Sequence, residues 1–122
     1  MKVLIVDDSM VIRRVITNAL KEMDVTDTED AKDGKEAVDA VKANEYDLVL
    51  MDWNMPNMLG IEAVKEIRAL GKKVPIIMVT TEAEKSRVVE AIKTGANNYV
   101  IKPFEPATLN EKIKQTMEKA GK

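Results

Sequence analysis

The chain has 122 residues, 45% of them hydrophobic, which is enough for one domain with a buried core. Its 19 basic and 21 acidic residues give a formal net charge of -2, a balance that gives no reason to expect nucleic-acid binding. No apolar run approaches the roughly 20 residues of a membrane span, and the apolar stretch after Met1 and Lys2 is too short for a signal peptide, so we expect a cytoplasmic protein with no membrane partner.

Two residue types are missing from the chain, and their absence narrows the possible chemistry. Without cysteine there is no disulfide, thiolate nucleophile or cysteine-based metal site. Without histidine there is no Ser-His-Asp triad, imidazole base or histidine-ligated zinc. Any metal must therefore be held by oxygen ligands, which suits magnesium, calcium or manganese. A nucleophile would be a carboxylate or a hydroxyl.

Short apolar runs alternate with longer segments of helical spacing along the chain. The first run, residues 2–6, predicts a strand that ends at two aspartates, Asp7 and Asp8. Ser9 suits the start of a helix, and apolar residues at helical spacing continue from residue 11 to residue 23. The first unit is therefore predicted to be a strand, an acidic loop and a helix.

Four similar units follow, each separated from the next by turn signals. Asp33-Gly34 and residues 54–57 are turn or loop signals, and Gly71 and Gly95 each stop a helix. The remaining predicted elements are a polar edge strand at 25–30, a helix at 37–41, a strand at 46–52, a helix at 61–70, a strand at 74–80, a helix at 88–92, a strand at 98–101 and a helix at 109–117.

This alternation predicts an α/β fold, a flavodoxin-like three-layer α/β/α sandwich around a five-stranded parallel sheet. Near-continuous apolar strands are typical of a parallel sheet that is covered on both faces. Right-handed crossovers favour the strand order 2-1-3-4-5, in which strands 1 and 3 are neighbours where the order reverses. No linker or repeat interrupts the pattern, so we expect a single domain over residues 1–122 with no output domain.

Polar residues follow the apolar strands at their carboxyl ends, where the crevice of an open parallel sheet lies. Asp7, Asp8, Asp52, Thr80 and Lys102 should therefore converge at one edge. Three carboxylates in one crevice repel one another unless a cation or protons intervene. The sequence therefore predicts a cation site at this edge.

Mg²⁺ is the cation that fits these residue types best, because it takes one or two carboxylates and keeps several waters. Asp8 and Asp52 can be direct ligands, Asp7 can act through water, and the backbone carbonyl of Asn54 can complete the site. This arrangement leaves a coordination position for a phosphate oxygen. The site would then serve a reaction of a phosphoryl group.

Asp52 could attack such a phosphoryl group, with Lys102 neutralising its charge from the opposite side. Thr80 could donate a hydrogen bond to a phosphoryl oxygen, although Thr81 is equally placed by pattern alone. Each residue also has a simpler interpretation: one of the first two aspartates can cap a helix, and Tyr99 can be a packing residue. The adjacent pair together with Asp52 favours the functional interpretation.

These residues resemble the response-regulator receiver domain family, and within it the chemotaxis members. The resemblance covers essentially the whole chain, and the segment around Asp52 is the most specific part of it. The matching segments are Val6-Asp7-Asp8-Ser9 with Arg13-Arg14, Asp33-Gly34-Lys35-Glu36-Ala37, Met51-Asp52-Trp53-Asn54-Met55-Pro56-Asn57-Met58, Val79-Thr80 and Tyr99-Val100-Ile101-Lys102-Pro103-Phe104.

The resemblance implies a chemical role for each residue at the edge of the sheet. Asp52 would be the phosphoacceptor, and Asp7 and Asp8 would be the acidic pair that holds Mg²⁺. Asn54 would give its backbone carbonyl to the metal. Lys102 would contact the phosphoryl group. The donor would be a phosphohistidine on a chemotaxis sensor histidine kinase, which agrees with the absence of histidine here.

The resemblance also implies a switch and its reset. Thr80 would be the switch hydroxyl, Tyr99 would change rotamer with it, and the Lys102-Pro103 bond would be cis. Asn54 and Glu82 would tune dephosphorylation, from which we hypothesise a short-lived phosphoryl state.

By resemblance the chain would be a stand-alone response regulator of two-component phosphorelay signalling and not a metabolic enzyme. It would be a monomer with its own phosphotransfer and autodephosphorylation chemistry. Its output surface would be the face of helix 4, strand 5 and helix 5, and its partner there the flagellar motor switch. A phosphatase would be a further partner.

Two positions depart from the family pattern. Leu59 stands where the family usually has an aspartate, outside the acidic residues, so the chemistry should survive. Thr81 stands where chemotaxis members often have alanine, and its larger side chain could slow access of the donor or of water to the site.

Three alternatives remain open on the sequence. A phosphorelay intermediate or phosphate sink would use the same residues. A phosphohydrolase with an aspartate nucleophile is less favoured, because such enzymes of the haloacid dehalogenase type separate their two aspartates by one residue, whereas Asp7 and Asp8 are adjacent. A flavin-binding module on the same topology is disfavoured, because the carboxylates would repel the flavin phosphate.

Overall fold

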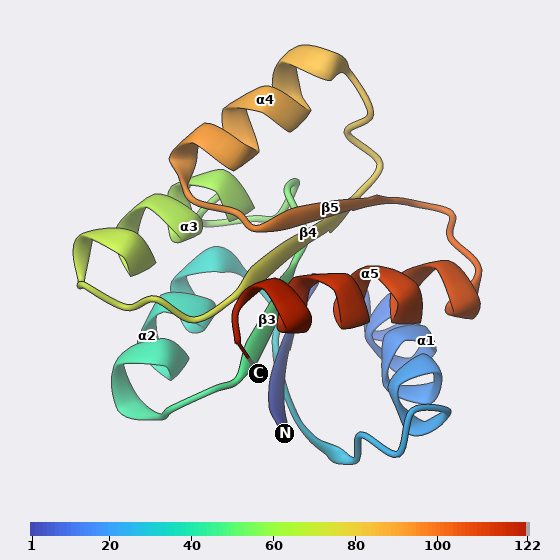
Figure 1. Ribbon diagram of the computed structural model, residues 1–122. Coiled ribbons are helices and arrows are strands. Elements are labelled where there is room, and N and C mark those ends of the chain that lie inside the picture. The colour runs from blue at the N-terminus through green and yellow to red at the C-terminus, as the bar shows by residue number, and fades with distance from the viewer. Residues whose placement is uncertain (122) are drawn as a thin grey trace.

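The computed structural model describes residues 1–121, in which five strands alternate with five helices (Figure 1). The strands are β1 (Lys2–Val6), β2 (Asp27–Ala31), β3 (Leu48–Met51), β4 (Ile76–Thr80) and β5 (Asn98–Ile101). The helices are α1 (Met10–Lys21), α2 (Gly34–Ala43), α3 (Gly60–Ala69), α4 (Lys85–Thr94) and α5 (Pro106–Lys119). Within this range, every helix is too short or too polar to cross a bilayer.

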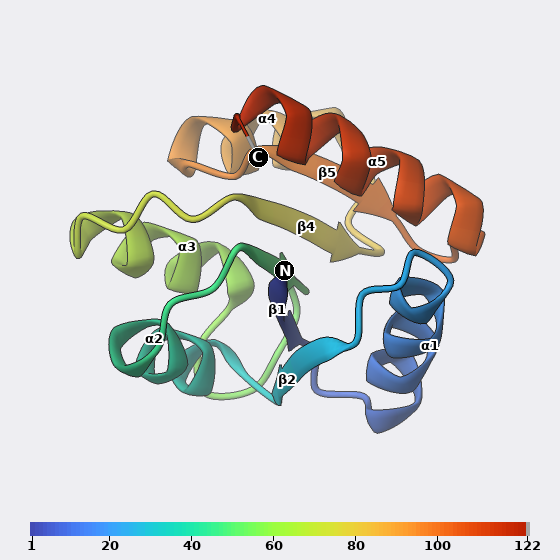
Figure 2. The same ribbon diagram turned by 60° about the horizontal axis from the view of Figure 1, so that its bottom comes forward.

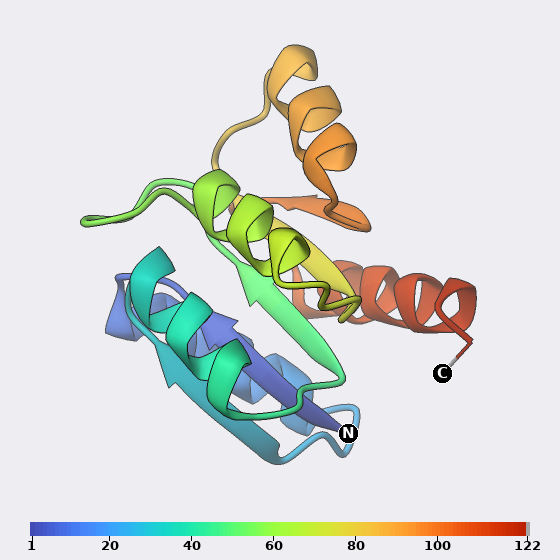
Figure 3. The ribbon, with the colours of Figure 1, turned by 90° about the vertical axis from the view of Figure 1, so that its left-hand side faces the viewer.

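The strands form one parallel sheet in the order β2-β1-β3-β4-β5, as predicted. Helices α1 and α5 cover one face of the sheet, and α2, α3 and α4 cover the other (Figures 2 and 3). This division follows from right-handed crossovers, because the chain moves one way from β1 to β2 and the opposite way from β2 through β5. The order therefore reverses between β1 and β3.

Alternation along the buried strands divides the apolar side chains between two cores. In β1, Leu4 and Val6 belong to the core under α2, α3 and α4, whereas Val3 and Ile5 belong to the core under α1 and α5. All four side chains are at most 1% exposed. The sheet is thus buried on both faces, which explains why its strands read as continuous apolar runs.

Three strands are shorter than the sequence pattern predicts. The edge strand β2 begins at Asp27, because the Val25 N–H donates back to the Leu20 carbonyl at the end of α1, at 3.0 Å. β3 spans Leu48–Met51, so the predicted ends at 46–47 and 52 lie outside it. β4 begins at Ile76, because Pro75 has no N–H to donate. The polar β2 does lie at an edge of the sheet, with three of its five residues exposed.

The carboxyl-terminal ends of α3 and α4 are joined by Arg68. Its Nε and Nη2 donate to the Gly95 carbonyl at 3.1 and 2.9 Å, and Nη1 donates to the Lys72 carbonyl at 2.9 Å. Nη2 also donates to Asn97 Oδ1 at 3.1 Å. Because α4 itself buries only Ala91, this contact is one of the few that fix the end of that helix against α3.

Arg68→Ala is therefore expected to destabilise the protein by about 2–4 kcal/mol, because it leaves two backbone carbonyls and the Asn97 side-chain oxygen without their charged donor. Urea unfolding followed by circular dichroism measures this change. Lys65→Ala is the matched control, since Lys65 is an exposed cation on the same helix and should change stability by less than about 0.5 kcal/mol. Equal losses in both variants would contradict the role given to Arg68.

Candidate functional site

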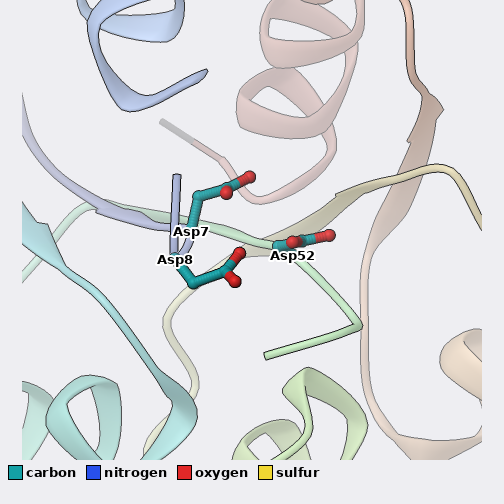
Figure 4. A group of neighbouring side chains, drawn as sticks. All are labelled: Asp7, Asp8 and Asp52. Carbon is teal, nitrogen blue, oxygen red and sulfur yellow. The ribbon is translucent and has the colours of Figure 1, made fainter. Parts of the chain in front are cut away.

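Three aspartates meet where β1 and β3 end. The two strands are paired with Val6 opposite Met51, so Asp7, Asp8 and Asp52, which follow them, lie side by side (Figure 4). One carboxylate oxygen from each lies within 4.8 Å of the others. Asp7 is 1% exposed and Asp52 is 6% exposed, whereas Asp8 faces solvent. We call these three residues the acid cluster.

Lys102 is the cation that the fold brings to the acid cluster. It follows β5 and precedes Pro103 through a cis peptide bond, as the resemblance implies. Its Nζ lies 2.6 Å from Asp7 Oδ2 and 3.4 Å from Asp52 Oδ1, and its side chain is 12% exposed. Its backbone N–H donates to the Thr80 carbonyl at 2.9 Å, which fixes the end of β5 against the end of β4.

The Asp52 carboxyl is held in an environment that opposes its ionisation. Burial and the nearby charge of Asp7 raise its pKa, and the Lys102 ammonium and a hydrogen bond from the Trp53 N–H offset this only in part. The Trp53 N–H donates to Asp52 Oδ1 at 2.8 Å. One lysine therefore does not balance the acid cluster, and a second positive charge would stabilise it.

The residues present fit a hard divalent cation such as Mg²⁺. All the side-chain donors of the acid cluster are carboxylate oxygens, and exposed Asp8 gives water access to the site. Asn54 lies in the loop after β3, two residues beyond Asp52, and its carbonyl oxygen has the same chemistry. Its side chain donates to Glu82 Oε1 at 2.9 Å.

The predicted switch residues Thr80 and Tyr99 both contact Glu82, in the loop after β4. Thr80 is fully buried, and its Oγ1 accepts from the Glu82 N–H at 3.2 Å. The Tyr99 hydroxyl, on β5, donates to the Glu82 carbonyl. Burial and the charge of Glu82 raise the pKa of Tyr99 to about 12, so Tyr99 stays protonated and can donate. Thr81, the alternative by pattern, is exposed.

The loop that carries Asn54 is held against the start of α2 by a side-chain hydrogen bond. Asn57, at φ 66°, donates from Nδ2 to Asp33 Oδ2 at 2.7 Å. Asp33 also caps α2, since its Oδ1 accepts from the Glu36 N–H at 2.8 Å. At the other end of the loop, a Cβ added to Gly60 would lie 1.8 Å from the Asp52 carbonyl oxygen, so a side chain there would displace the backbone of Asp52.

Two features of the site were not found by sequence reasoning. Arg87, on α4, lies with its guanidinium carbon 5.6 Å from the centroid of the Trp53 ring, and Trp53 is 2% exposed. No spacing in the sequence marks this cation–π contact, because it joins α4 to the loop after β3. The Asp33–Asn57 contact was also missed, although Asp33 followed by Glu36 three residues later is a helix-start signal.

Asp52→Asn is expected to stabilise the metal-free protein at neutral pH. A carboxyl whose pKa is raised on folding opposes folding once it ionises, so its removal should raise the Tm by a few degrees, the shift that about 1 kcal/mol produces in a small domain. The gain should shrink as the pH falls below the raised pKa of the folded state and should vanish below about 3, where the wild-type carboxyl is protonated in both the folded and the unfolded state. Thermal unfolding in EDTA measures it, with exposed Asp39→Asn as the charge-matched control.

Asp33→Ala should destabilise the protein at neutral pH, whereas Asp52→Asn should stabilise it. Hydrogen bonds from the Glu36 N–H and the Asn57 amide lower the pKa of Asp33, so its contribution to stability is present above about pH 4 and is lost as the pH falls further. The variant should lose about 1–2 kcal/mol at pH 7, the scale of a lost helix cap, and less at low pH. Urea unfolding across pH, with Asp39→Ala as control, tests this; a loss that does not vary with pH would contradict it.

Comparison with known proteins agrees with this geometry. Residues 3–114 match the family described as "Response regulator receiver domain". The chain is 42% identical over 121 residues to chemotaxis protein CheY-3 of Vibrio cholerae, covering 98% of this chain and 93% of that protein. It is 41% identical to chemotaxis protein CheY of Pseudomonas aeruginosa, covering 99% of both.

Solved structures of receiver domains and chemotaxis proteins also resemble this chain. The receiver domain of the Francisella response regulator 1452 has a TM-score of 0.90 and 31% identity, with 98% of each chain covered. Vibrio cholerae chemotaxis protein CheY4 has a TM-score of 0.87 and 37% identity, covering 94% of this chain and 97% of that one. The order β2-β1-β3-β4-β5, the acid cluster and these matches agree: the chain belongs to the response regulator receiver domain family and has its CheY-like, flavodoxin-like fold.

Proposed function

We propose that this chain is a phosphorylation switch of two-component signalling, in which Asp52 accepts a phosphoryl group from a chemotaxis histidine kinase and a changed surface binds a partner. The observation that carries the proposal is a buried aspartate placed among two further aspartates and a lysine. Its family supports a signalling role rather than metabolic catalysis. The relatives named as chemotaxis proteins support chemotaxis as the pathway.

In the proposed transfer, an Asp52 carboxylate oxygen attacks the phosphorus of a phosphohistidine on the kinase. The bond from phosphorus to the histidine nitrogen breaks, its electron pair stays on that nitrogen, and Asp52 becomes an acyl phosphate. Lys102 Nζ, 3.4 Å from Asp52 Oδ1, neutralises charge on the transferring group. Mg²⁺ held by the acid cluster and the Asn54 carbonyl would supply further neutralisation.

Phosphorylation would act on the loop after β4 through Thr80. The Thr80 Oγ1 now accepts from the Glu82 N–H, so its hydroxyl proton remains available to a phosphoryl oxygen. If Thr80 turns toward that oxygen, the Glu82 contact is lost. Because the Tyr99 hydroxyl donates to the Glu82 carbonyl, a movement of this loop reaches β5 directly.

The partner-binding surface that this movement would change lies on α4 and β5. Glu90 and Thr94 line a groove against α3, so the opposite side of α4, which carries Val89 and Ile92, faces away from α3. These two side chains are 43% and 47% exposed, and Ile101 on β5 is 40% exposed. Exposed apolar side chains on a loosely packed helix suit partner binding. We propose the flagellar motor switch as that partner on the α4, β5 and α5 face.

The proposed switch also needs a way to remove the phosphoryl group from Asp52. Asn54 and Glu82 are hydrogen-bonded to each other beside the site, which supports a role for both in orienting the water that would hydrolyse the acyl phosphate. A separate phosphatase would work at the same position. The exposed apolar side of α4 favours an output role over that of a phosphate sink, because a sink needs no partner surface.

Trp53, next to Asp52, gives a direct test. Its fluorescence should change in a saturable way with Mg²⁺ and change again on addition of acetyl phosphate or beryllofluoride, because the backbone N–H of Trp53 donates to Asp52 and any movement of that carboxylate shifts the buried Trp53 residue. The second change should disappear in Asp52→Asn. Fluorescence titration and phosphoprotein gel analysis on the same samples measure both steps.

Asp39→Asn is the matched control, because it removes one carboxylate from an exposed position on α2. It should respond to both additions as the wild type does. An Asp52→Asn protein that still responds to acetyl phosphate, or a wild type that forms no phosphoprotein, would overturn the proposal.

A further inference from the structure

Arg13, on α1, holds the backbone at the end of β1. Its Nη1 donates to the Asp7 carbonyl oxygen at 2.6 Å, and its Nε donates to Asp30 Oδ2, on β2, at 3.1 Å. The Arg13 side chain is 15% exposed. The guanidinium therefore joins α1, the end of β1 and the end of β2 at the backbone of Asp7, one member of the acid cluster.

With this contact, every polar atom of Asp7 has a partner. Its N–H donates to the Ala31 carbonyl at 3.1 Å, Oδ1 accepts from the Ser9 N–H at 2.9 Å, and Oδ2 pairs with Lys102. Its carbonyl is the atom that Arg13 binds. Asp7 is thus fixed both through its side chain and through its backbone.

Asp8 is in the opposite situation. Among residues 1–121, no hydrogen bond or ion pair holds its carboxylate, and the residue is exposed. The direction in which its side chain leaves the backbone is set by the peptide that joins it to Asp7. Arg13 binds the carbonyl of that peptide, so it orients Asp8 without touching its side chain.

Arg13 also carries a positive charge, which by itself would oppose cation binding nearby. Asp30 pairs with the guanidinium at 3.1 Å, so the two charges largely cancel at a distance. The two roles give opposite results when Arg13 is removed: loss of a repelling charge would tighten cation binding, whereas loss of orientation would weaken it. Because of the Asp30 pairing, orientation should be the larger effect.

We propose that Arg13 is a positioning residue for the cation site, which sets Mg²⁺ affinity by holding the Asp7–Asp8 peptide in place. This inference rests on the proposed function, in that the acid cluster binds Mg²⁺. Residues that orient metal ligands from outside the ligand set typically change metal affinity by about tenfold or more when they are removed. Arginine suits the position because its planar fork reaches two acceptors at once.

The test is a Mg²⁺ titration followed by Trp53 fluorescence and by calorimetry, on the wild type, Arg13→Ala, Arg13→Lys and Arg14→Ala. Arg13→Ala should bind Mg²⁺ about tenfold more weakly. Arg13→Lys should fall in between, because one ammonium cannot reach both acceptors in the same geometry. Arg14→Ala is the control, since it removes an exposed arginine from the same helix and should leave the affinity within about twofold of the wild type.

Two further measurements separate positioning from other roles. Repeating the titration in about 1 M KCl, where charges are screened beyond roughly 3 Å, should leave the difference between wild type and Arg13→Ala in place. The Tm in EDTA reports structural loss separately. If Arg13→Ala does not fold, the Mg²⁺ affinity of Arg13→Lys is measured at low temperature instead and compared with that of the wild type.

The outcomes are distinct. Unchanged or tighter Mg²⁺ binding by folded Arg13 variants overturns the positioning role and leaves the proposed function in place. A lower Tm with unchanged affinity also overturns it, because the role would then be structural only. A wild type that does not bind Mg²⁺ overturns the metal site of the proposed function, and this inference with it.

Discussion

The repulsion between three carboxylates at the ends of β1 and β3 is the constraint on which the rest of the site depends. The parallel pairing of these strands places Asp7, Asp8 and Asp52 side by side, and burial prevents water from screening the two inner ones. Lys102 offsets part of this cost through its contacts with Asp7 and Asp52. The pKa of Asp52 nevertheless stays raised, first because of burial and then because of the charge of Asp7, so a cation at the acid cluster would stabilise its ionised form.

The fold around this site combines firmly held and loosely held parts. The strands and the backbone of Asp7 are fixed by sheet pairing, by Arg13 and by Lys102. In contrast, α4 buries only Ala91. Its contacts include Arg68 at its carboxyl-terminal end and Arg87 over Trp53 near its amino-terminal end, beside the Tyr99–Glu82 contact of the preceding loop. In the proposed function, a site that gains charge would lie beside a helix with a single buried residue, and a switch requires an element that is held by few buried contacts.

Much of this arrangement could be predicted from particular residues. The apolar runs that end at Asp7, Asp52 and Thr80 indicated the parallel sheet and its functional edge, because carboxyl ends of parallel strands meet at one edge. Strand limits were less certain: Val25 and Tyr46 look like strand residues in the sequence, but they pack as loop residues at the margins of the two cores. An apolar side chain can be buried without its backbone joining a ladder.

The sequence by itself determined the class of fold, the sheet edge at which chemistry can occur and the oxygen-only donor set, because periodicity, strand-end residues and the lack of cysteine and histidine are local properties. Only the tertiary structure decided how the residues are held. Arg13 on the Asp7 carbonyl, Arg87 over Trp53 and Asn57 on Asp33 join segments from different units of the chain, and nothing in their local sequence specifies the partner. The reason is physical: a polar side chain interacts with whichever group the packed helices and strands bring within its reach.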